Sequence, residues 1–251
     1  LSSLLLLLIS DKRGQDTFGL LVSSGHTEKI YKVNTDPSKV FKREDYKDFI
    51  HSSLENLTIG KPVSVIGQTR LVTNGTKFLA ENNQPIITNN IIGVHNGIIV
   101  GDTKKTDLNI KLNNEGYNVK SDSLNLFENL SNLFLKDQKN FAENYSKYLK
   151  KVDGNYSISF RIPLIKSNFL SSNCGSLYYL KTDDYLLYAS EKAILEDFLK
   201  KTKSNYNQKD FNIIKNFNNH IIFNDQLEIF KLTNINKNKS FFINNTYKIF
   251  D

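Results

Sequence analysis

The amino-acid sequence predicts one α+β domain, and three observations support this fold class. Apolar residues recur at helical spacing between residues 122 and 135, which is typical of an amphipathic helix with one buried face. From residue 155 onward, short apolar runs alternate with polar turns, as they do in strands. No internal repeat, linker or low-complexity tract divides the 251 residues, so we expect the helices and strands to share one domain.

The same patterns predict the elements in chain order. Helices are expected at 1–10, where the chain is apolar nearly all round, from Pro37 toward Leu57, and at 104–115, 122–135, 140–151 and 190–201. Strands are expected at 17–24 and 29–34, as a hairpin around Gly25, and at 63–70, 155–162, 176–181, 185–189, 211–217, 219–224, 226–232 and 241–250.

Some helix boundaries carry their own signals. Pro37 suits the first turn of a helix, because that turn does not use the amide hydrogen that proline lacks. Ser121 and Asp122 are both good caps for the helix that follows them. Asp153 and Gly154 are typical of a helix end, so we expect the helix 140–151 to stop there.

The apolar run 91–100 is interrupted at its centre by His95, Asn96 and Gly97. In a buried strand, Asn has to find hydrogen-bond partners and Gly weakens the strand, so such an interruption is expected mainly at a functional site. A tight type I′ turn at Asn-Gly, joining two short strands, explains the same pattern. The local sequence leaves both interpretations open.

Composition narrows the classes of function. The formal net charge is +7, but the lysines are scattered, so we expect a solvated lysine surface and no nucleic-acid partner. The longest apolar run, Leu4 to Ile9, is far shorter than the ~20 residues of a membrane span, so no membrane partner is expected. Cys174 is the only cysteine, which excludes an internal disulfide and fits a reducing, cytoplasmic compartment.

Metal and nucleophile motifs are scarce. The four histidines lie far apart in the sequence and no phosphate-binding glycine loop is present, so we expect no metal and no cofactor. A Cys-His hydrolase centred on Cys174, with His95 or His220 as the base, is one hypothesis. The segment from Ser171 to Gly175 is more typical of a turn between strands, which favours a structural cysteine.

Four short segments, taken together, are the strongest functional signal. They are Arg13-Gly14-Gln15-Asp16-Thr17-Phe18-Gly19, Gly67-Gln68-Thr69-Arg70-Leu71-Val72-Thr73-Asn74-Gly75, Gly93-Val94-His95-Asn96-Gly97-Ile98-Ile99 and Ser121-Asp122-Ser123. In this order and spacing they resemble the class II glutamine amidotransferases, whose patterns are approximately R-G-x-D-S-x-G, G-H-T-R-x-A-T-x-G, H-N-G-x-I and S/T-D-S/T. The segments 153–158, 174–177 and 187–191 look like later motifs of the family, so the resemblance covers about residues 1–232.

This resemblance implies a fold and domain boundaries. The fold of the family is a four-layer αββα sandwich of the N-terminal-nucleophile hydrolase type, in which two stacked antiparallel sheets are flanked by helices. We expect residues 1–235 to form the glutamine amidotransferase domain. Residues 236–251 are expected to be a C-terminal extension or the start of a link to a synthase domain.

The resemblance also implies a reaction. In this family an N-terminal Cys, with its own α-amino group as general base, attacks the side-chain amide of glutamine and forms a γ-glutamyl thioester. Water then releases glutamate, and the ammonia passes through a protected tunnel to a second active site. The expected partners are therefore glutamine and a synthase domain or subunit that receives the ammonia, and the chain leaves homo-oligomer formation open.

Family roles fall on matching positions of this sequence. The side-chain amide of Asn96 and the backbone N–H of Gly97 match the oxyanion hole. Arg70 matches the arginine that binds the α-carboxylate of glutamine, since a guanidinium fork suits a carboxylate. Asp122 matches the aspartate that binds the α-ammonium group, although a helix N-cap explains the same residue.

Further positions match parts of the family site that surround these four. Thr73 and Asn74 are expected to line the glutamine pocket, because they follow the carboxylate-binding arginine. Arg13, Gly14 and Asp16 match a motif next to the nucleophile, and we expect a structural role for them.

Two departures from the family pattern bear on activity. Gln68 replaces the His of G-H-T-R, a variation that we expect the pocket to tolerate. The family nucleophile lies on a short strand before the helix expected at 1–10, which places it upstream of Leu1. An incomplete N-terminus or a degenerate relative explains this, and the intact oxyanion and substrate-binding residues favour an incomplete N-terminus of an active enzyme.

Three functions follow from the resemblance. We favour delivery of ammonia to a sugar or nucleotide precursor, because the segments 13–16 and 96–99 look more like the sugar-phosphate and purine branches of the family. One alternative is a catalytically inactive module that binds glutamine or a partner protein. The other is the glutaminase half of an asparagine-synthetase-like enzyme.

Overall fold

The computed structural model of the protein describes residues 16–24, 27–55, 62–70, 82–102, 121–203, 211–214 and 220–231. The helices expected at 1–10 and 104–115 and the strand expected at 241–250 lie outside these residues.

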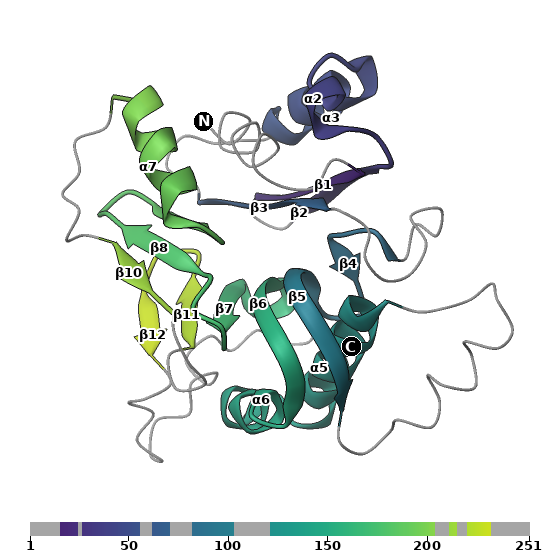
Figure 1. The fold of residues 1–251 in the computed structure, drawn as a ribbon, viewed down its shortest axis with the longest axis vertical. Coiled ribbons are helices and arrows are strands. Elements are labelled where there is room, and N and C mark those ends of the chain that lie inside the picture. Colours follow the sequence, from purple (N-terminus) through teal and green to yellow (C-terminus); the bar gives the residue numbers. More distant parts are fainter. Residues whose placement is uncertain are drawn as a thin grey trace, which may run out of the picture.

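The described strands form three antiparallel sheets (Figure 1). One sheet has the order β2-β1-β3 and consists of β1 (Thr17–Ser24), β2 (Thr27–Val33) and β3 (Val63–Arg70). A six-stranded sheet has the order β12-β11-β7-β6-β5-β4 and consists of β4 (Ile86–Ile87), β5 (Ile92–Asp102), β6 (Val152–Ile162), β7 (Ser167–Ser172), β11 (Ile221–Asn224) and β12 (Ile229–Lys231). The third sheet has the order β10-β8-β9 and consists of β8 (Tyr178–Lys181), β9 (Leu186–Ala189) and β10 (Asn212–Ile213).

The described helices are α2 (Pro37–Val40), α3 (Glu44–Leu54), α5 (Asp122–Lys136), α6 (Phe141–Leu149), α7 (Lys192–Lys201) and the short 3₁₀ helix η2 (Pro163–Ile165). The single helix expected from Pro37 toward Leu57 is therefore wrong, because two helices occupy this range. The helix end expected at Asp153-Gly154 is also wrong: α6 ends at Leu149, and both residues belong to β6.

One face of the six-stranded sheet is covered by helices. Side chains alternate between the two faces of a strand, so Tyr156, Ile158 and Phe160 of β6 share one face. They belong to a core cluster with residues of α5 and α6, including Phe134 and Phe141. The amphipathic helix predicted at 122–135 thus buries its apolar stripe on this sheet.

The opposite face of the six-stranded sheet packs against both three-stranded sheets. Val94 of β5 clusters with Leu21 of β1 and Ile66 of β3. Leu170 of β7 clusters with Tyr179 of β8. The space between the sheets is therefore closed by apolar side chains at two separate places.

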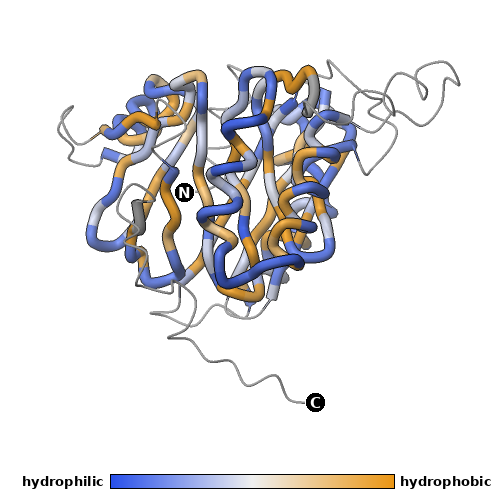
Figure 2. Tube along the Cα trace, turned by 90° about the horizontal axis from the view of Figure 1, so that it is seen from below, coloured by the Kyte–Doolittle hydropathy of each residue, from blue (hydrophilic) through white to orange (hydrophobic). Residues whose placement is uncertain are grey.

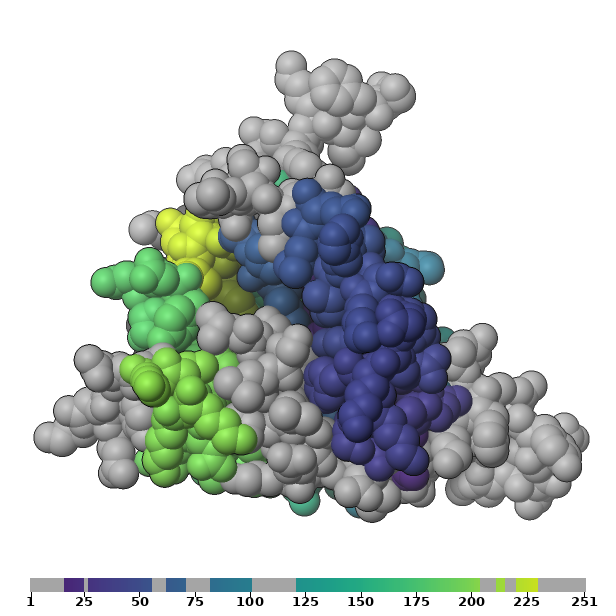
Figure 3. Space-filling model, turned by 90° about the horizontal axis from the view of Figure 1, so that it is seen from above, coloured from purple at the N-terminus to yellow at the C-terminus, as the bar shows by residue number. Residues whose placement is uncertain are grey.

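The outer faces of the three-stranded sheets carry the remaining helices. Phe18 of β1 clusters with Val40 of α2 and Tyr46 of α3, while Leu180 of β8 clusters with Leu195 of α7. These helices lie on the same face of the molecule, with α7 in green and α2 and α3 in dark blue (Figure 3). Apolar and hydrophilic stretches alternate along the chain, as expected for elements with one buried face (Figure 2). The structure is thus a mixed α+β fold with antiparallel sheets, as the sequence predicts.

Candidate active site

Strand β5 continues through the Asn-Gly pair that interrupts its apolar run. Asn96 is paired with Ser157 of β6 and Gly97 with Tyr156, so the alternative of a turn at this position is wrong. Gly97 has a φ of 144°, and a Cβ atom there would lie 2.0 Å from the carbonyl oxygen of Asn155. Glycine is therefore required here, because any side chain would collide with the neighbouring strand.

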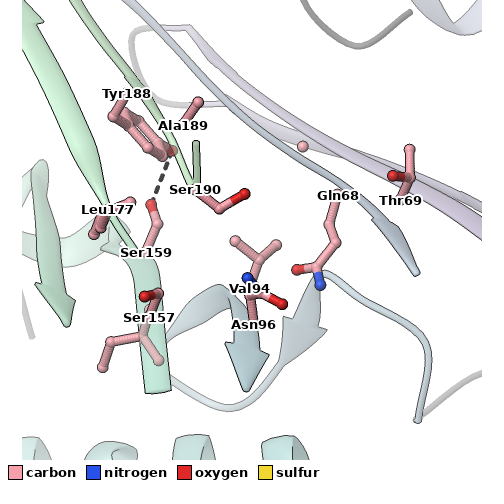
Figure 4. A pocket seen from close by; sticks show the side chains of 12 residues that line it. Gln68, Thr69, Val94, Asn96, Ser157, Ser159, Leu177, Tyr188, Ala189 and Ser190 are labelled. Atoms are coloured by element: carbon pink, nitrogen blue, oxygen red, sulfur yellow. Dashed lines mark hydrogen bonds between the residues drawn. The ribbon is translucent and has the colours of Figure 1, made fainter. Parts of the chain in front are cut away.

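Asn96 lines a pocket of about 90 Å³ that lies between the sheets (Figure 4). The pocket is lined by Gly67, Gln68 and Thr69 of β3, Val94 and Asn96 of β5, Ser157, Ile158 and Ser159 of β6, and by Leu177, Tyr188, Ala189 and Ser190. At one side the hydroxyl of Ser159 donates to the phenol oxygen of Tyr188 over 2.8 Å. The pocket therefore combines hydroxyl and amide groups from both layers of strands.

Arg70 is the last residue of β3 and is buried, with 8% of its surface exposed. Its Nη1 donates to the carbonyl of Asn82 over 3.0 Å, and its own carbonyl accepts the N–H of Asp16 over 3.0 Å. Burial lowers the pKa of the Arg70 guanidinium, and the nearby carboxylates of Asp122 and Asp16 oppose this shift. Arg70 is therefore a buried cation beside two carboxylates, which argues against a surface arginine at a strand end.

Asp122 is the first residue of α5, but the N-cap of that helix is Ser121, whose hydroxyl accepts the N–H of Leu124 over 3.2 Å. The carboxylate of Asp122 accepts the N–H of Ile99 on β5 over 3.0 Å and the N–H of Ser123 over 2.8 Å. The hydroxyl of Ser123 donates to it as well, over 3.4 Å. A carboxylate offers about four lone-pair positions, so these three bonds leave capacity for one further donor. The N-cap explanation of Asp122 is thus wrong, and its carboxylate faces β5.

A hydrogen-bonded network of buried side chains connects β5 to α5. The N–H of His95 donates to Oε1 of Gln84 over 2.7 Å, and its carbonyl accepts from Nε2 of Gln84 over 2.8 Å and from Nε2 of Gln68 over 2.9 Å. The Nδ1 atom of His95 lies 2.9 Å from the Ser123 hydroxyl. Burial lowers the pKa of His95, against the opposing effect of Asp122, so the ring is neutral at neutral pH.

Asn82 and Gln84 contact residues of the site but are not predicted from the sequence, and Ser123 is predicted only as part of the motif Ser121-Asp122-Ser123. Asn82 contributes twice, since its carbonyl accepts from Arg70 and its side chain accepts the N–H of Ser121 over 2.9 Å. The segment from Asn82 to Gln84 is buried although it is wholly polar, and in the sequence it reads as part of a loop. No local signal distinguishes it from a solvated loop.

The predicted residues that the structure describes gather in one corner of the molecule. Asp16, Arg70, Asn96, Gly97 and Asp122 lie around the end of β3, the middle of β5 and the start of α5. Of these five, only Asn96 lines the pocket. The other predicted residues lie outside the described part of the chain: Arg13, Gly14, Thr73 and Asn74.

Cys174 lies in the bend that follows β7, as the turn interpretation predicts, and is exposed. Burial of the thiol raises its pKa, but hydrogen bonding to serine hydroxyls, first that of Ser176 at 3.0 Å, outweighs this effect and lowers the pKa. The Nδ1 atoms of His95 and His220 lie within hydrogen-bonding distance of serine hydroxyls. These contacts give no support to a Cys-His pair at Cys174.

Two further features concern only the described residues. No group of three or more His, Cys, Asp and Glu side chains among them is arranged to hold a metal ion. No helix among them is long and apolar enough to cross a membrane.

Comparisons with known proteins are informative only at the level of structure. No protein-family model and no curated protein matches the sequence. The glutamine phosphoribosylpyrophosphate amidotransferase from B. subtilis, complexed with ADP and GMP, matches with a TM-score of 0.60 and 18% identity, over 91% of this chain and 46% of that protein. A structure of the allosteric regulatory enzyme of purine biosynthesis matches with a TM-score of 0.61 and 20% identity, over 92% of this chain and 46% of that protein.

These identities are low, and this chain spans less than half of each of the two proteins, so the matches establish the fold alone. Over at least 91% of its length, the chain has the fold of the class II glutamine amidotransferase domains.

Proposed function

We propose that this chain is a glutamine amidotransferase domain that hydrolyses glutamine to glutamate and ammonia. The observation that carries the proposal is the convergence of Arg70, Asp122 and the Asn96-Gly97 pair at one corner of the fold. Glutamine hydrolysis requires a cation for the α-carboxylate, an anion for the α-ammonium group and donors for the oxyanion, and these residues supply all three.

The direction of the β5 backbone supports the oxyanion assignment. The N–H groups of His95 and Ile99 both point to the outer edge of β5, where they donate to Gln84 and Asp122. Regular alternation along a strand gives the N–H of Gly97, midway between them, the same direction. A backbone donor aimed at the outer edge, beside the carboxylate of Asp122, is the arrangement that an oxyanion hole next to an ammonium site requires.

The proposal requires that the native protein carries an N-terminal Cys upstream of Leu1. Among the described residues, β3 and β9 are the outermost strands of their sheets, and they face each other across the pocket that Asn96 lines. Edge strands present N–H and C=O groups that a further strand can pair with. A strand in this position would bring its nucleophile next to Asn96, and it would join the two small sheets into one layer of a four-layer αββα sandwich.

The ammonia acceptor that we favour is a sugar or nucleotide precursor, bound by a synthase domain or subunit. The motif variants at 13–16 and 96–99 support this choice. The first structural neighbour acts in phosphoribosylpyrophosphate amidotransfer and the second in purine biosynthesis, which is compatible with it. We also propose domain bounds of 1–235, a cytoplasmic location and the absence of nucleic-acid partners.

A second candidate is a catalytically inactive module that binds glutamine. The position of the single cysteine favours it, because Cys174 lies in an exposed bend and its thiol has serine partners and no histidine partner within the described part of the chain. Binding of glutamine through Arg70 and Asp122, without release of glutamate, would identify this module.

The test is glutamate release from glutamine by the full-length native protein, compared with its Asn96→Ala variant. Removing one oxyanion donor typically lowers kcat by ~10²–10³-fold, and we expect a loss of that size. Asn89→Ala is the matched control, because Asn89 is an exposed asparagine outside the site. A loss below about tenfold would contradict the oxyanion assignment, since one such donor is worth more than that.

A further inference from the structure

The side chain of Gln84 occupies the place of a strand residue beside β5. In the β4–β5 pair, Ile86 lies opposite Gly93 and Ile87 opposite Ile92, so the same register would place residue 84 opposite His95. Strand β4 begins only at Ile86, however, and the backbone of Gln84 is not part of it. Its side-chain amide makes the two bonds instead: Oε1 accepts the His95 N–H over 2.7 Å and Nε2 donates to the His95 carbonyl over 2.8 Å. These are the two bonds that a paired strand residue exchanges through its backbone.

The backbone of Gln84 lies against a different sheet. A Cβ atom at Gly19 of β1 would lie 1.8 Å from the carbonyl oxygen of Gln84, so the backbones of these two residues are in direct contact. Gln84 is 4% exposed. The residue therefore bridges the two layers of strands, with its backbone against β1 and its amide against β5.

Gln68 of β3 contacts the same peptide from the other layer. Its Nε2 donates to the His95 carbonyl over 2.9 Å, so this one oxygen accepts from two glutamine amides. The carbonyl belongs to the peptide bond that joins His95 to Asn96. Rotation of that peptide would break both hydrogen bonds to this carbonyl, while the third bond, from the His95 N–H to Gln84, holds the preceding peptide, between Val94 and His95.

Because the Gln84 side chain, and not the backbone of a longer β4, pairs with His95, the edge of β5 beyond His95 is left without a neighbouring β4 strand. A continued β4 would run past His95 and would cover the edge at Gly97. On β5 the Gln84 amide bonds to His95 alone, and the next contact along this edge among the described residues is that of Ile99 with Asp122. The edge position at Gly97 thus lies between the contact of His95 with Gln84 and that of Ile99 with Asp122, and β4 does not reach it.

We propose that Gln84, assisted by Gln68, is a positioning residue of the active site. It holds the His95–Asn96 peptide so that the Asn96 side chain faces the pocket and the Gly97 N–H faces the outer edge. This inference rests on the proposed glutaminase function, because the two groups that it positions are the predicted oxyanion donors.

The test uses Gln84→Met in the full-length native protein. Gln138→Met is the matched control, because Gln138 is an exposed glutamine in the bend between α5 and α6. Misplacing catalytic groups by about 1 Å costs ~10²-fold in rate, and we expect a loss of this size in kcat. KM for glutamine should stay close to that of the wild type, since Arg70 and Asp122 are unchanged. In Gln84→Glu, one carboxylate oxygen can still accept the His95 N–H, but the other oxygen replaces the Nε2 donor and faces the carbonyl oxygen of His95. We therefore expect kcat to fall in this variant too.

A second readout does not depend on turnover. Without the Gln84 amide, the His95 N–H loses its acceptor, and hydrogen exchange in the segment 94–98 should become faster in Gln84→Met but not in Gln138→Met. Unchanged exchange, or an unchanged kcat, would overturn the inference. A rise in KM that matches the fall in kcat, together with a lower Tm, would reduce Gln84 to a structural residue.

The two readouts separate this inference from the proposed function. A wild-type protein that releases no glutamate contradicts the glutaminase proposal and, with it, a role for Gln84 in catalysis. Faster exchange in Gln84→Met would then still support the contact with β5. Glutamate release by the wild type, with normal kcat in Gln84→Met, contradicts the positioning role alone.

Discussion

His220 is a fully buried histidine whose contacts stabilise its neutral form. It is 1% exposed, its Nδ1 lies 2.7 Å from the hydroxyl of Ser171, and its ring lies 5.1 Å from that of Tyr145, measured between ring centroids. Burial lowers the pKa of His220 to about 4, and the positive charge of Lys150 acts in the same direction. The ring is therefore uncharged at neutral pH, and protonation of the folded state is unfavourable.

This shift predicts a loss of stability in acid. The pKa of His220 is about 6.5 in an unfolded chain and about 4 in the fold, so the unfolded state binds more protons between these values. Stability should therefore fall as the pH decreases through this window, by up to about 3 kcal/mol from this residue. Urea unfolding of the wild type and of His220→Asn should show a weaker pH dependence in the variant. Equal slopes for the two proteins across the window would contradict the assignment.

Whether a residue of the candidate site could be predicted depends on how far away in the sequence its hydrogen-bond partners lie. Arg70, Asn96 and Asp122 could be predicted, because their residue types and motif context indicate charge recognition and oxyanion binding. Gln84 and Asn82 could not, because their partners are distant in sequence: His95 is 11 positions from Gln84, and Ser121 is 39 positions from Asn82. A polar residue that is buried by such contacts looks like a loop residue in the sequence alone.

At the scale of elements, periodicity predicts those strands and helices that bury one regular face. The strands at 17–24 and 63–70 have the predicted bounds, and α5 differs from its prediction by one residue. The helix expected from Pro37 toward Leu57 divides at Arg43, whose backbone is extended, with a φ of −75° and a ψ of 138°, whereas Phe41 at the end of α2 is still helical. On either side of this break, Phe41 and Tyr46 of α3 both pack edge-on against Phe18 of β1.

Strands β6 and β7 show why other boundaries were not predictable. Gly154, read as a helix end, is needed inside β6 because a Cβ there would lie 2.2 Å from the carbonyl oxygen of Ile98. The sequence predicts no strand at β7, which begins and ends with serine. Ser171 and Ser172 are buried there through hydrogen bonds to His220 and Ser157. Their burial depends on distant elements and leaves no hydrophobic pattern.

At the scale of the whole molecule, one arginine connects three distant parts of the chain. Arg161 of β6 is 1% exposed; its Nε donates to Glu28 of β2 over 2.9 Å, and its two terminal nitrogens donate to Asp225, after β11, over 2.7 and 3.0 Å. Burial lowers the pKa of Arg161, but these carboxylates outweigh it and raise the pKa. The pair with Glu28 joins the six-stranded sheet to the β2-β1-β3 sheet.

Arg161→Met should therefore be strongly destabilising. It leaves two carboxylates without their buried cation, and removing one partner of a buried ion pair typically costs about 3–5 kcal/mol. Lys147→Met is the control, because Lys147 forms an exposed pair with Glu143 on α6, and such pairs contribute little. Urea unfolding measures both variants. Equal destabilisation by the two substitutions would contradict a bridging role for Arg161.

A glutaminase with an N-terminal nucleophile forms a covalent intermediate with glutamine, and trapping this intermediate tests the proposed function. The full-length native protein is incubated with glutamine and quenched in acid, and its N-terminal peptide is analysed by mass spectrometry. We expect a cysteine upstream of Leu1 that carries a γ-glutamyl thioester, with release of glutamate before the quench. A native N-terminus without a nucleophile, together with no adduct and no glutamate, would contradict it.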